Sequence, residues 1–244
     1  MYSPRDWPAV LAADLYIPRS EGLRPAVLVV HGGGWKGGQR GDMDRIAERL
    51  AERGFVVMNA SYRLAPAHRF PAQLQDLQQA LGWLRAAAPR YGVDPRRVGG
   101  FGYSAGAHLV ALLGTIDTPG SRLQALVTGG LPSDLRRYPD GKLVIQLLGA
   151  TFEENPALFA AASPIVHVSA GDPPMFLYHG ALDKTVDPSH SVEMKRALDR
   201  AGVRAELRTV PLLGHLLTFV LARGTESEAM DFLEEVLSFA ARGS

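Results

Sequence analysis

Short apolar runs alternate with amphipathic helical segments along the chain, and this alternation constrains the fold more than any other feature. The runs lack the regular polar positions of a half-exposed strand, which indicates strands buried on both faces. They lie at residues 26–30, 55–60, 98–103, 123–128 and 174–178, and a further strand is expected at 205–210. Buried strands that alternate with helices form a parallel sheet covered on both sides. The pattern therefore predicts an α/β fold with a mostly parallel central sheet.

Helical segments are expected between and after these strands. In residues 71–88, leucines recur at spacings of three and four, at positions 74, 77, 81 and 84. The other helices are expected at residues 42–53, 105–113, 190–201 and 226–241. In parallel sheets, binding and catalytic residues collect at the carboxyl ends of the strands. We therefore expect the chemistry of this chain just after Val30, Tyr103, Tyr178 and Val210.

The composition excludes several classes of function. The 244 residues carry a net charge of +1, which does not favour binding to nucleic acid or to an anionic membrane. Because the chain has no cysteine, disulfides, thiolate metal sites and cysteine nucleophiles are excluded. No apolar stretch approaches the about 20 residues that span a bilayer, and the first residues do not form a secretory signal. We therefore expect a single domain over residues 1–244, which is cytoplasmic unless the sequence is the mature form of a secreted protein.

Residues 102–106, Gly-Tyr-Ser-Ala-Gly, fit the pattern G-x-S-x-G between a predicted strand and a predicted helix. A serine on so tight a turn has strained backbone geometry and an exposed hydroxyl, and flanking glycines let the neighbouring backbone pass without a clash. The start of the helix adds N–H donors and a dipole that favour a developing anion. A small-residue turn that only packs a helix on a strand is the alternative. The surrounding strand and helix favour Ser104 as a nucleophile.

Residues 31–35, His-Gly-Gly-Gly-Trp, follow the first predicted strand. Ester hydrolysis passes through a tetrahedral oxyanion that needs preorganised donors, and glycines let backbone N–H groups approach it closely. We assign Gly33 and Gly34 as oxyanion donors, with the N–H of Ala105 as the third. A phosphate loop is excluded because neither G-x-x-x-x-G-K-[ST] nor a G-x-G-x-x-G that opens a helix is present. His31 is expected to hold the loop by hydrogen bonds.

The acid and the base are expected downstream of the serine, in the order Ser, Asp or Glu, His. Asp183 lies on the loop after the strand at 174–178, and His215 follows the strand that ends at Val210. His215 would take the proton from Ser104. Asp183 would fix the tautomer of the imidazole and stabilise the imidazolium.

Other downstream residues compete for these two roles. His179 is expected to brace the loop of Asp183. Asp187 could instead start the next helix, and Asp172 is typical of a turn because two prolines follow it. The remaining histidines do not lie just beyond a predicted strand end; they are His167 and His190.

Several segments together resemble the esterase and lipase branch of the α/β-hydrolases. They are HGGGW at 31–35, SYRLAP at 61–66, FPAQLQDL at 70–77, GYSAGAHL at 102–109, ASPIVHVSAGDPPMFLYHGALDKTV at 162–186 and GH at 214–215. The chain is most similar to bacterial carboxylesterases grouped with bifunctional feruloyl and acetyl xylan esterases, and the hormone-sensitive-lipase-like esterases are near relatives. The resemblance extends over nearly the whole chain. It implies the α/β-hydrolase fold, carboxylic esters as small-molecule substrates, a Ser-His-Asp mechanism on the residues assigned above, and neither metal nor cofactor.

The chain departs from the hormone-sensitive-lipase-like esterases at two points. Tyr103 stands where they usually carry an acidic residue, and only residues 1–25 precede the first core strand, so a minimal or absent cap is expected. Residues 136–170 could form a small lid, and helically spaced leucines in this segment could line an acyl pocket. An ordinary core position fits these leucines slightly better. They are Leu143, Leu147, Leu148 and Leu158.

A shallow, nearly capless site favours short-chain acyl esters. Trp35 and Tyr103, which belong to the two glycine motifs, are the candidates for lining the substrate pocket. Two other functions stay open. One is an arylformamidase or other amidase on the same fold. The other is an inactive ligand-binding homologue, although such proteins usually lose the serine, the acid or the histidine.

Overall fold

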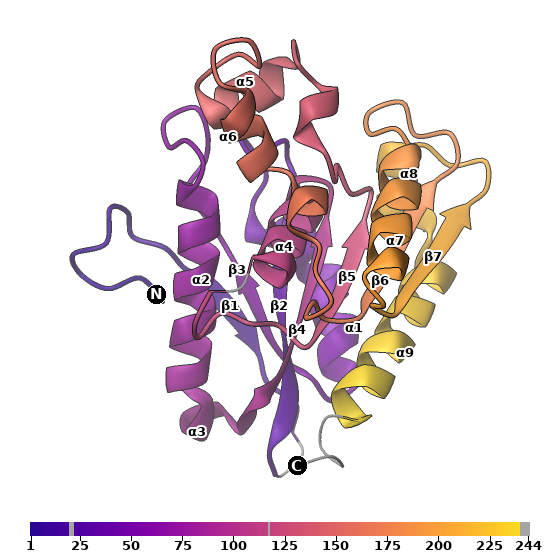
Figure 1. The fold of residues 1–244 in the computed structure, drawn as a ribbon. Helices are drawn as coiled ribbons and strands as arrows, with labels where there is room; N and C mark the ends of the chain where they lie inside the picture. Colours follow the sequence, from indigo (N-terminus) through magenta and orange to yellow (C-terminus); the bar gives the residue numbers. More distant parts are fainter. Residues whose placement is uncertain (20–21, 117, 240–244) are drawn as a thin grey trace.

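The computed structural model describes residues 1–19, 22–116 and 118–239. Within them, one seven-stranded sheet has the strand order β1-β3-β2-β4-β5-β6-β7 (Figure 1). β1 is antiparallel to β3, and every other neighbouring pair is parallel. The predicted mostly parallel sheet is confirmed. The strands are β1 Ala13–Tyr16, β2 Arg24–Val30, β3 Val56–Ala60, β4 Val93–Tyr103, β5 Ala125–Gly129, β6 Met175–Gly180 and β7 Ala205–Val210.

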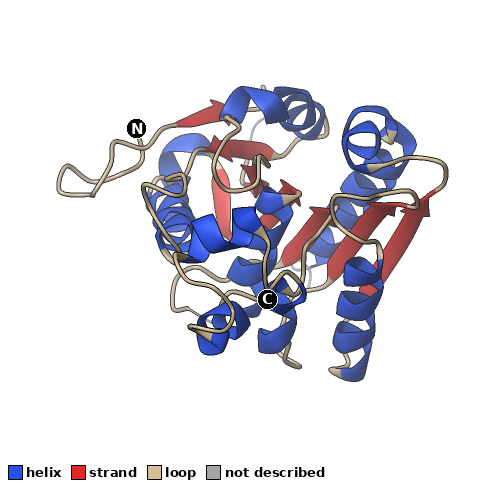
Figure 2. Cartoon of the chain, turned by 90° about the horizontal axis from the view of Figure 1, so that it is seen from above, coloured by secondary structure: helices blue, strands red, loops and turns tan. Residues whose placement is uncertain are grey.

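Long helices cover both faces of the sheet (Figure 2). α1 (Asp44–Glu52) and α9 (Arg223–Phe239) pack on one face, whereas α2 (Ala72–Ala86), α4 (Ala105–Thr115) and α7 (Ser189–Arg200) pack on the other. In the described part of the chain, no helix combines the length and the apolarity needed to cross a membrane. The shorter elements are η1 Arg40–Met43, α3 Ala88–Tyr91, η2 Leu135–Arg137, α5 Lys142–Leu148, α6 Pro156–Ala161, η3 Pro164–His167 and α8 His215–Leu221.

β2 shows how the sheet separates two apolar cores. Val27 and Val29 belong to the core that contains the apolar side of α1, and the alternate residues Leu28 and Val30 belong to the core that contains α2 and α4. All four side chains are fully buried. Burial of one such side chain contributes about 1.5–3 kcal/mol. The two cores therefore fix the central strands, and with them the strand ends that carry the motifs.

The structure differs from the sequence prediction mainly at the edges of elements. β1 has no continuous apolar pattern because it is a partly exposed edge strand of four residues. β4 begins at Val93, since this residue already pairs with Arg24 of β2. The helix expected at 226–241 begins at Arg223, and residues 240 and 241 lie outside the described residues.

The carboxyl ends of the parallel strands lie at one edge of the sheet, at the top of Figure 1. β2 ends at the glycine loop, β4 at the serine turn, β6 just before Asp183 and β7 just before His215. Four motifs that are far apart in the sequence therefore meet at this edge.

Candidate active site

Ser104 occupies the tight turn between β4 and α4. Its φ is 55°, a left-handed conformation that non-glycine residues rarely adopt. Its N–H donates a hydrogen bond of 2.8 Å to the carbonyl oxygen of Gly129. The turn requires glycine at position 106, because a Cβ there would lie 2.1 Å from the carbonyl oxygen of Val30. The second glycine of the G-x-S-x-G pattern thus has a direct steric origin.

The glycine loop after β2 folds back on itself beside this turn. Gly33 has a φ of 106°, which favours glycine, and its carbonyl oxygen accepts hydrogen bonds from the N–H groups of Lys36 and Gly37. The loop lies against the serine, since a Cβ on Gly32 would be 3.4 Å from the Cβ of Ser104. The loop is therefore both closed by its own backbone and in contact with the candidate nucleophile.

The three predicted oxyanion donors surround Ser104. Gly33 and Gly34 line one cavity together with the serine, and Ala105 lines another. Among the hydrogen bonds of the described residues, none uses the N–H of Gly33, Gly34 or Ala105. N–H groups without a protein acceptor, next to a serine and at the start of a helix, can stabilise a developing negative charge.

His31 supports the glycine loop from within the core. Its ring stacks on Tyr62 at a centroid distance of 4.4 Å, and the Tyr62 hydroxyl donates a hydrogen bond of 3.0 Å to the His31 carbonyl oxygen. Burial lowers the pKa of His31 below its ordinary value, so the ring is neutral. Its Nδ1–H then donates to the carbonyl oxygen of Gly32 at 2.8 Å. These contacts place His31 in the supporting position that the sequence predicts.

His215 is the first residue of α8, and its ring lies between the serine and the aspartate. Its Nδ1–H donates to Oδ2 of Asp183 at 2.5 Å, and its Nε2 accepts a hydrogen bond of 2.9 Å from Oγ of Ser104. The carboxylate on one side assigns the resting proton to Nδ1. The lone pair of Nε2 therefore faces the serine hydroxyl, which is the arrangement needed to accept its proton.

Hydrogen-bond donors enclose the carboxylate of Asp183. Its Oδ1 accepts from the N–H groups of Thr185 and Val186 at 2.8 and 2.9 Å, and its Oδ2 lies 3.2 Å from Nε2 of His179. Burial raises the pKa of Asp183, but the hydrogen bonds from His179 and His215 outweigh burial and hold this pKa well below its ordinary value. Asp183 is therefore ionised near neutral pH, and its charge can stabilise a protonated His215.

His179, at the end of β6, braces the loop that carries Asp183. Its Nε2–H donates to the carbonyl oxygen of Val186 at 2.9 Å, and its Nδ1 accepts from the hydroxyl of Ser191 at 2.7 Å. Both ring nitrogens are thus engaged in the interior of the protein. The ring fixes the loop and is not directed at Ser104.

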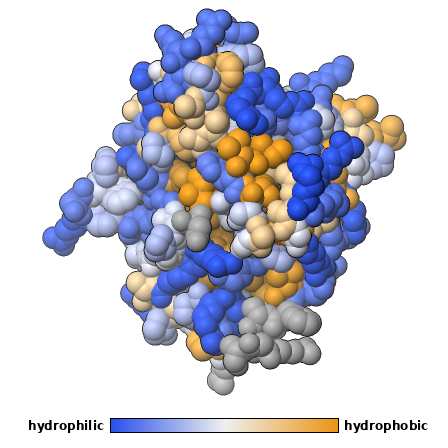
Figure 3. All heavy atoms as spheres, viewed as in Figure 1, coloured by the Kyte–Doolittle hydropathy of each residue, from blue (hydrophilic) through white to orange (hydrophobic). Residues whose placement is uncertain are grey.

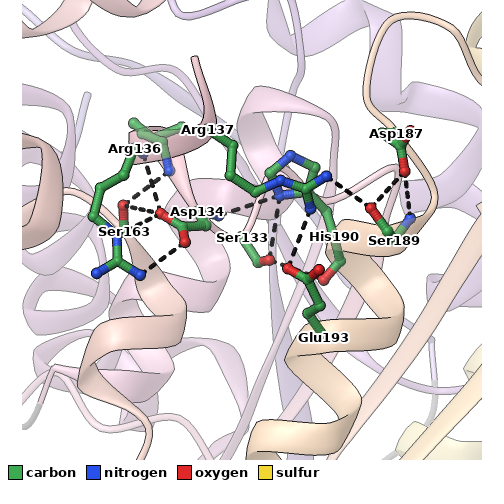
Figure 4. A network of polar contacts seen from close by, with 10 residues as sticks. Ser133, Asp134, Arg136, Arg137, Ser163, Asp187, Ser189, His190 and Glu193 are labelled. Atoms are coloured by element: carbon green, nitrogen blue, oxygen red, sulfur yellow. Dashed lines mark hydrogen bonds and ion pairs between the residues drawn. The ribbon is translucent and has the colours of Figure 1, made fainter. Parts of the chain in front are cut away.

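The rival acid Asp187 and the rival base His190 are engaged elsewhere, as Figure 4 shows. Asp187 accepts a hydrogen bond of 2.8 Å from the N–H of Ser189, the first residue of α7. His190 is buried, and its Nδ1 accepts from the N–H of Asp134 at 3.3 Å. Burial lowers the pKa of His190 to about 4, so the ring is neutral. Asp172 accepts hydrogen bonds in the turn before β6, at the opposite edge of the sheet.

Two cavities meet at Ser104. The first, which we call the α5 cavity, has a volume of about 240 Å³ and is lined by residues that include Trp35, Pro132, Tyr138, Lys142 and Val144. The second, the α8 cavity, has a volume of about 500 Å³ and is lined by residues that include Met43, Tyr103, Leu216, Phe219 and Val220. His215 lines the α8 cavity, whereas Leu143 and Thr185 line both. A substrate carbonyl at Ser104 would therefore have space on both sides.

Trp35 belongs to the wall of the α5 cavity and is linked to the core through a buried histidine. Its Nε1–H donates to Nδ1 of His108 at 3.1 Å, and Nε2–H of His108 donates to the carbonyl oxygen of Ala162 at 2.7 Å. Burial lowers the pKa of His108 to about 4, so the ring is neutral. Trp35 therefore has a fixed position beside the serine.

Tyr103 borders the α8 cavity but is only 4% exposed. Its hydroxyl donates a hydrogen bond of 2.5 Å to the carbonyl oxygen of His215, and its ring packs against the rings of His215 and Phe219 at centroid distances of 5.2 and 4.8 Å. These contacts make Tyr103 mainly a support for His215, a role that sequence reasoning did not foresee.

Within residues 136–170, α5 and α6 lie above the carboxyl edge of the sheet (Figure 1). Leu147 and Leu148 are buried in the core, and Leu158 packs against the core from a partly buried position. Leu143 is 40% exposed and lines both cavities. Three of the four leucines thus occupy core positions, and one faces the site.

The model of the BD-FAE family matches residues 13–198, a range that includes the glycine loop, Ser104 and Asp183. The chain belongs to the BD-FAE family. The resemblance predicted from the sequence is thereby confirmed.

Curated relatives of this BD-FAE chain include mycobacterial esterases. Esterase LipC of Mycobacterium tuberculosis is 30% identical over 203 residues, which cover 73% of this chain and 50% of that protein. The probable carboxylic ester hydrolase LipM of the same organism is 29% identical and covers 91% of this chain and 57% of that protein. The chain spans about half the length of the curated relatives it matches.

Solved structures share the fold over nearly the whole BD-FAE chain. The esterase Est2 of Thermogutta terrifontis has a TM-score of 0.83 at 27% identity, covering 96% of this chain and 90% of that one. An acetyl ester-xyloside bifunctional hydrolase from Caldicellulosiruptor lactoaceticus has a TM-score of 0.85 at 26% identity, covering 96% and 91%. Other Est2 structures are described as propionate-bound and butyrate-bound. These likenesses confirm the α/β-hydrolase fold.

Sequence reasoning missed the residues that shape the α8 cavity. Leu216, Phe219 and Val220 line it from α8, a helix that the sequence analysis does not predict. A signal was present, because residues 212–221 are mostly apolar and surround a candidate base. The BD-FAE family match ends at residue 198 and does not reach them.

Proposed function

We propose that this protein is a serine carboxylic ester hydrolase, with Ser104 as nucleophile, His215 as general base and Asp183 as the residue that orients the base. One observation carries the proposal: the two ring nitrogens of His215 lie 2.9 Å from Oγ of Ser104 and 2.5 Å from Oδ2 of Asp183. The esterases among the relatives and the solved structures support the same reaction class. They do not favour the amidase or the ligand-binding alternative.

The first half-reaction acylates the enzyme. Oγ of Ser104 attacks the carbonyl carbon of the ester, while Nε2 of His215 takes the hydroxyl proton. The carbonyl oxygen becomes an oxyanion that accepts hydrogen bonds from the N–H groups of the glycine loop and of Ala105. The carbonyl then re-forms, the bond to the alcohol oxygen breaks, and Nε2–H protonates that oxygen. The products are an acyl-serine and the free alcohol.

The second half-reaction repeats these steps with water. A water molecule takes the place of the alcohol beside Nε2 of His215 and attacks the acyl carbon as the imidazole takes its proton. The same N–H groups hold the second oxyanion. When it collapses, the bond to Oγ of Ser104 breaks and Nε2–H returns the proton to Oγ, which releases the carboxylic acid.

The position of His215 supports different roles for the two cavities. The leaving oxygen must lie beside Nε2 of His215, so the alcohol leaves through the α8 cavity and the acyl group occupies the α5 cavity on the other side of Ser104. The α5 cavity holds about 240 Å³, less than the roughly 300–1,000 Å³ of common ligand pockets. This volume supports a preference for short acyl groups, as do the propionate-bound and butyrate-bound structures of Est2.

We further propose that residues 136–170 form a small lid over the α5 cavity, within a single domain of residues 1–244. Leu143 of α5 lies on the glycine loop, because its Cδ1 would be 2.9 Å from a Cβ placed on Gly34. Buried Leu147 and Leu148 anchor the same helix in the core. This arrangement supports a lid that touches the oxyanion loop directly.

Hydrolysis of p-nitrophenyl esters from acetate to palmitate tests the proposed function. We expect the rate to peak at short acyl chains, because the α5 cavity is small. Ser104→Ala should lower kcat by about four orders of magnitude, since the nucleophile is lost. Ser169→Ala, at an exposed turn on the opposite edge of the sheet, is the matched control and should keep full activity.

The same preparation separates the alternatives. A folded Ser104→Ala variant that retains most of the activity would contradict the assignment of the nucleophile. Hydrolysis of aryl formamides without any ester hydrolysis would indicate the amidase alternative. Absence of labelling of Ser104 by a fluorophosphonate, together with no hydrolysis, would indicate a ligand-binding protein.

A further inference from the structure

α8 exposes the apolar side chains that a surface helix normally buries. Thr218 is the one buried residue of its seven. We call four exposed side chains the α8 face; they are Leu216, Leu217, Val220 and Leu221, with exposed fractions of 70, 52, 44 and 56%. Apolar atoms gather at the upper right edge of Figure 3, where Figure 1 places α8 and the loops beside it. An exposed apolar surface of this kind commonly marks a binding site.

The α8 face has two halves with different surroundings. Leu216 and Val220 are four residues apart, so they share one side of the helix, and both line the α8 cavity with Ser104 and His215. Leu217 and Leu221 have the same spacing and similar exposure, but neither lines the α5 or the α8 cavity. One half of the face is therefore continuous with the reacting groups, and the other is not.

The rest of the α8 cavity is also poor in groups that could bind hydroxyls. Met43 and Phe219 add apolar surface. The hydroxyl of Tyr103 is already bonded to the His215 carbonyl oxygen. The one carboxylate among the described lining residues is Asp42, whose Oδ2 accepts the N–H of Gln39 at 2.9 Å, and Thr185 adds a single hydroxyl. A polyhydroxylated alcohol would leave most of its hydroxyls without partners here, and an anionic one would meet Asp42.

Building on the proposed function, we propose that Leu216 and Val220 bind the alcohol part of the ester, and that the preferred alcohols are uncharged and apolar, such as alkyl or aryl alcohols, rather than sugars. The alcohol oxygen must reach Nε2 of His215, the first residue of α8, to be protonated as it leaves. The carbon chain attached to that oxygen therefore extends along the first turns of the same helix. Each methylene group buried against these side chains should raise kcat/KM by about fourfold.

The test compares two esters that share the acyl group and differ in the alcohol, ethyl acetate and hexyl acetate, both below their solubility limits. We expect wild-type kcat/KM to be at least about tenfold higher for hexyl acetate. The double variant L216A/V220A should lower this ratio by about tenfold, mainly through KM. The double variant L217A/L221A is the matched control, on the same helix and with the same replacement, and should keep the wild-type ratio.

Each contrary result has a separate meaning. A wild-type ratio near one, or faster hydrolysis of an acetylated pentoside than of hexyl acetate, would overturn the proposed alcohol preference. An equal loss in both double variants would overturn the role of Leu216 and Val220 and indicate that the whole α8 face contacts a lipid surface or substrate aggregates. Absence of any Ser104-dependent ester hydrolysis would instead reject the proposed function, and the alcohol site with it. Circular dichroism of both double variants checks that they keep the wild-type fold.

Discussion

α4 directly follows a residue of the proposed triad and α8 begins with one, yet the two helices are held in opposite ways. α4 follows Ser104, and ten of its eleven residues are buried. α8 begins with His215, and one of its seven residues is buried. The core therefore fixes the nucleophile, whereas a few specific hydrogen bonds hold the base on a surface helix. The buried side of this site therefore sets the position of the reacting serine, and the exposed side is the one where, in the proposed reaction, substrate enters and alcohol leaves.

The strongest test of the rigid side is Gly106→Ala. The new Cβ would lie 2.1 Å from the carbonyl oxygen of Val30, so the backbone of α4 or β2 must move. We expect the free energy of unfolding to fall by about 3 kcal/mol or more. Gly82→Ala is the matched control, because it lies at an exposed position of α2 with no heavy atom within 4 Å, and it should raise stability by up to about 1 kcal/mol. Urea unfolding measures the stability of both variants. Similar unfolding midpoints for Gly106→Ala and Gly82→Ala would contradict the expected difference.

A smaller effect is expected from the buried histidine of α4. The pKa of His108 is about 4 in the folded protein, against about 6.5 for an exposed histidine in the unfolded chain. Between these values the unfolded state binds more protons, so stability is fully present above about pH 6.5 and falls toward pH 4. The loss due to His108 approaches about 3 kcal/mol. His108→Gln removes this group, and its unfolding free energy should fall less than that of wild type between about pH 7 and about pH 4.5. If the unfolding free energies of the two proteins fell by the same amount over this pH range, the assignment of His108 as a neutral buried group would be contradicted.

The smallest effect tests how α8 is attached. Tyr103→Phe removes the hydrogen bond to the carbonyl oxygen of His215 but keeps the ring that packs on it. We expect kcat to fall by about tenfold, equivalent to about 1.4 kcal/mol, with little change in KM. Tyr178→Phe is the matched control, because the buried hydroxyl of Tyr178 has no hydrogen-bond partner within the described residues. An unchanged kcat in Tyr103→Phe would show that His215 does not need this anchor.

The sequence predicts the central sheet and the meeting of the motifs because both depend on local patterns joined by one general rule. Each continuous apolar run ends at a recognisable turn, and the carboxyl ends of parallel strands share one edge. This suffices to bring Ser104, Asp183 and His215 together. β1 escapes prediction because it is four residues long and partly exposed, and α8 escapes because it lacks the polar face by which a surface helix is recognised.

The supporting contacts could not be predicted from spacing. The hydrogen bond from Tyr103 to His215 joins residues 112 positions apart, and the one from His108 to Ala162 joins residues 54 positions apart. Such contacts depend on how helices and loops pack in three dimensions, for which the sequence shows no periodic signal. The sequence therefore predicts Tyr103 as a pocket-lining residue and gives no sign of its contact with His215.

The hydrogen bonds from Trp35 to His108 and from His108 to Ala162 limit how the active site can move. They connect the end of the glycine loop to the base of segment 136–170 through a fully buried ring with both nitrogens engaged. Separate motion of either partner would leave a buried polar group unpaired, at a cost of about 1–3 kcal/mol. A displacement of the glycine loop is therefore coupled to a displacement of segment 136–170. An acyl group too large for the α5 cavity would displace the oxyanion donors as it entered, so poor fit would slow the chemical step as well as weaken binding.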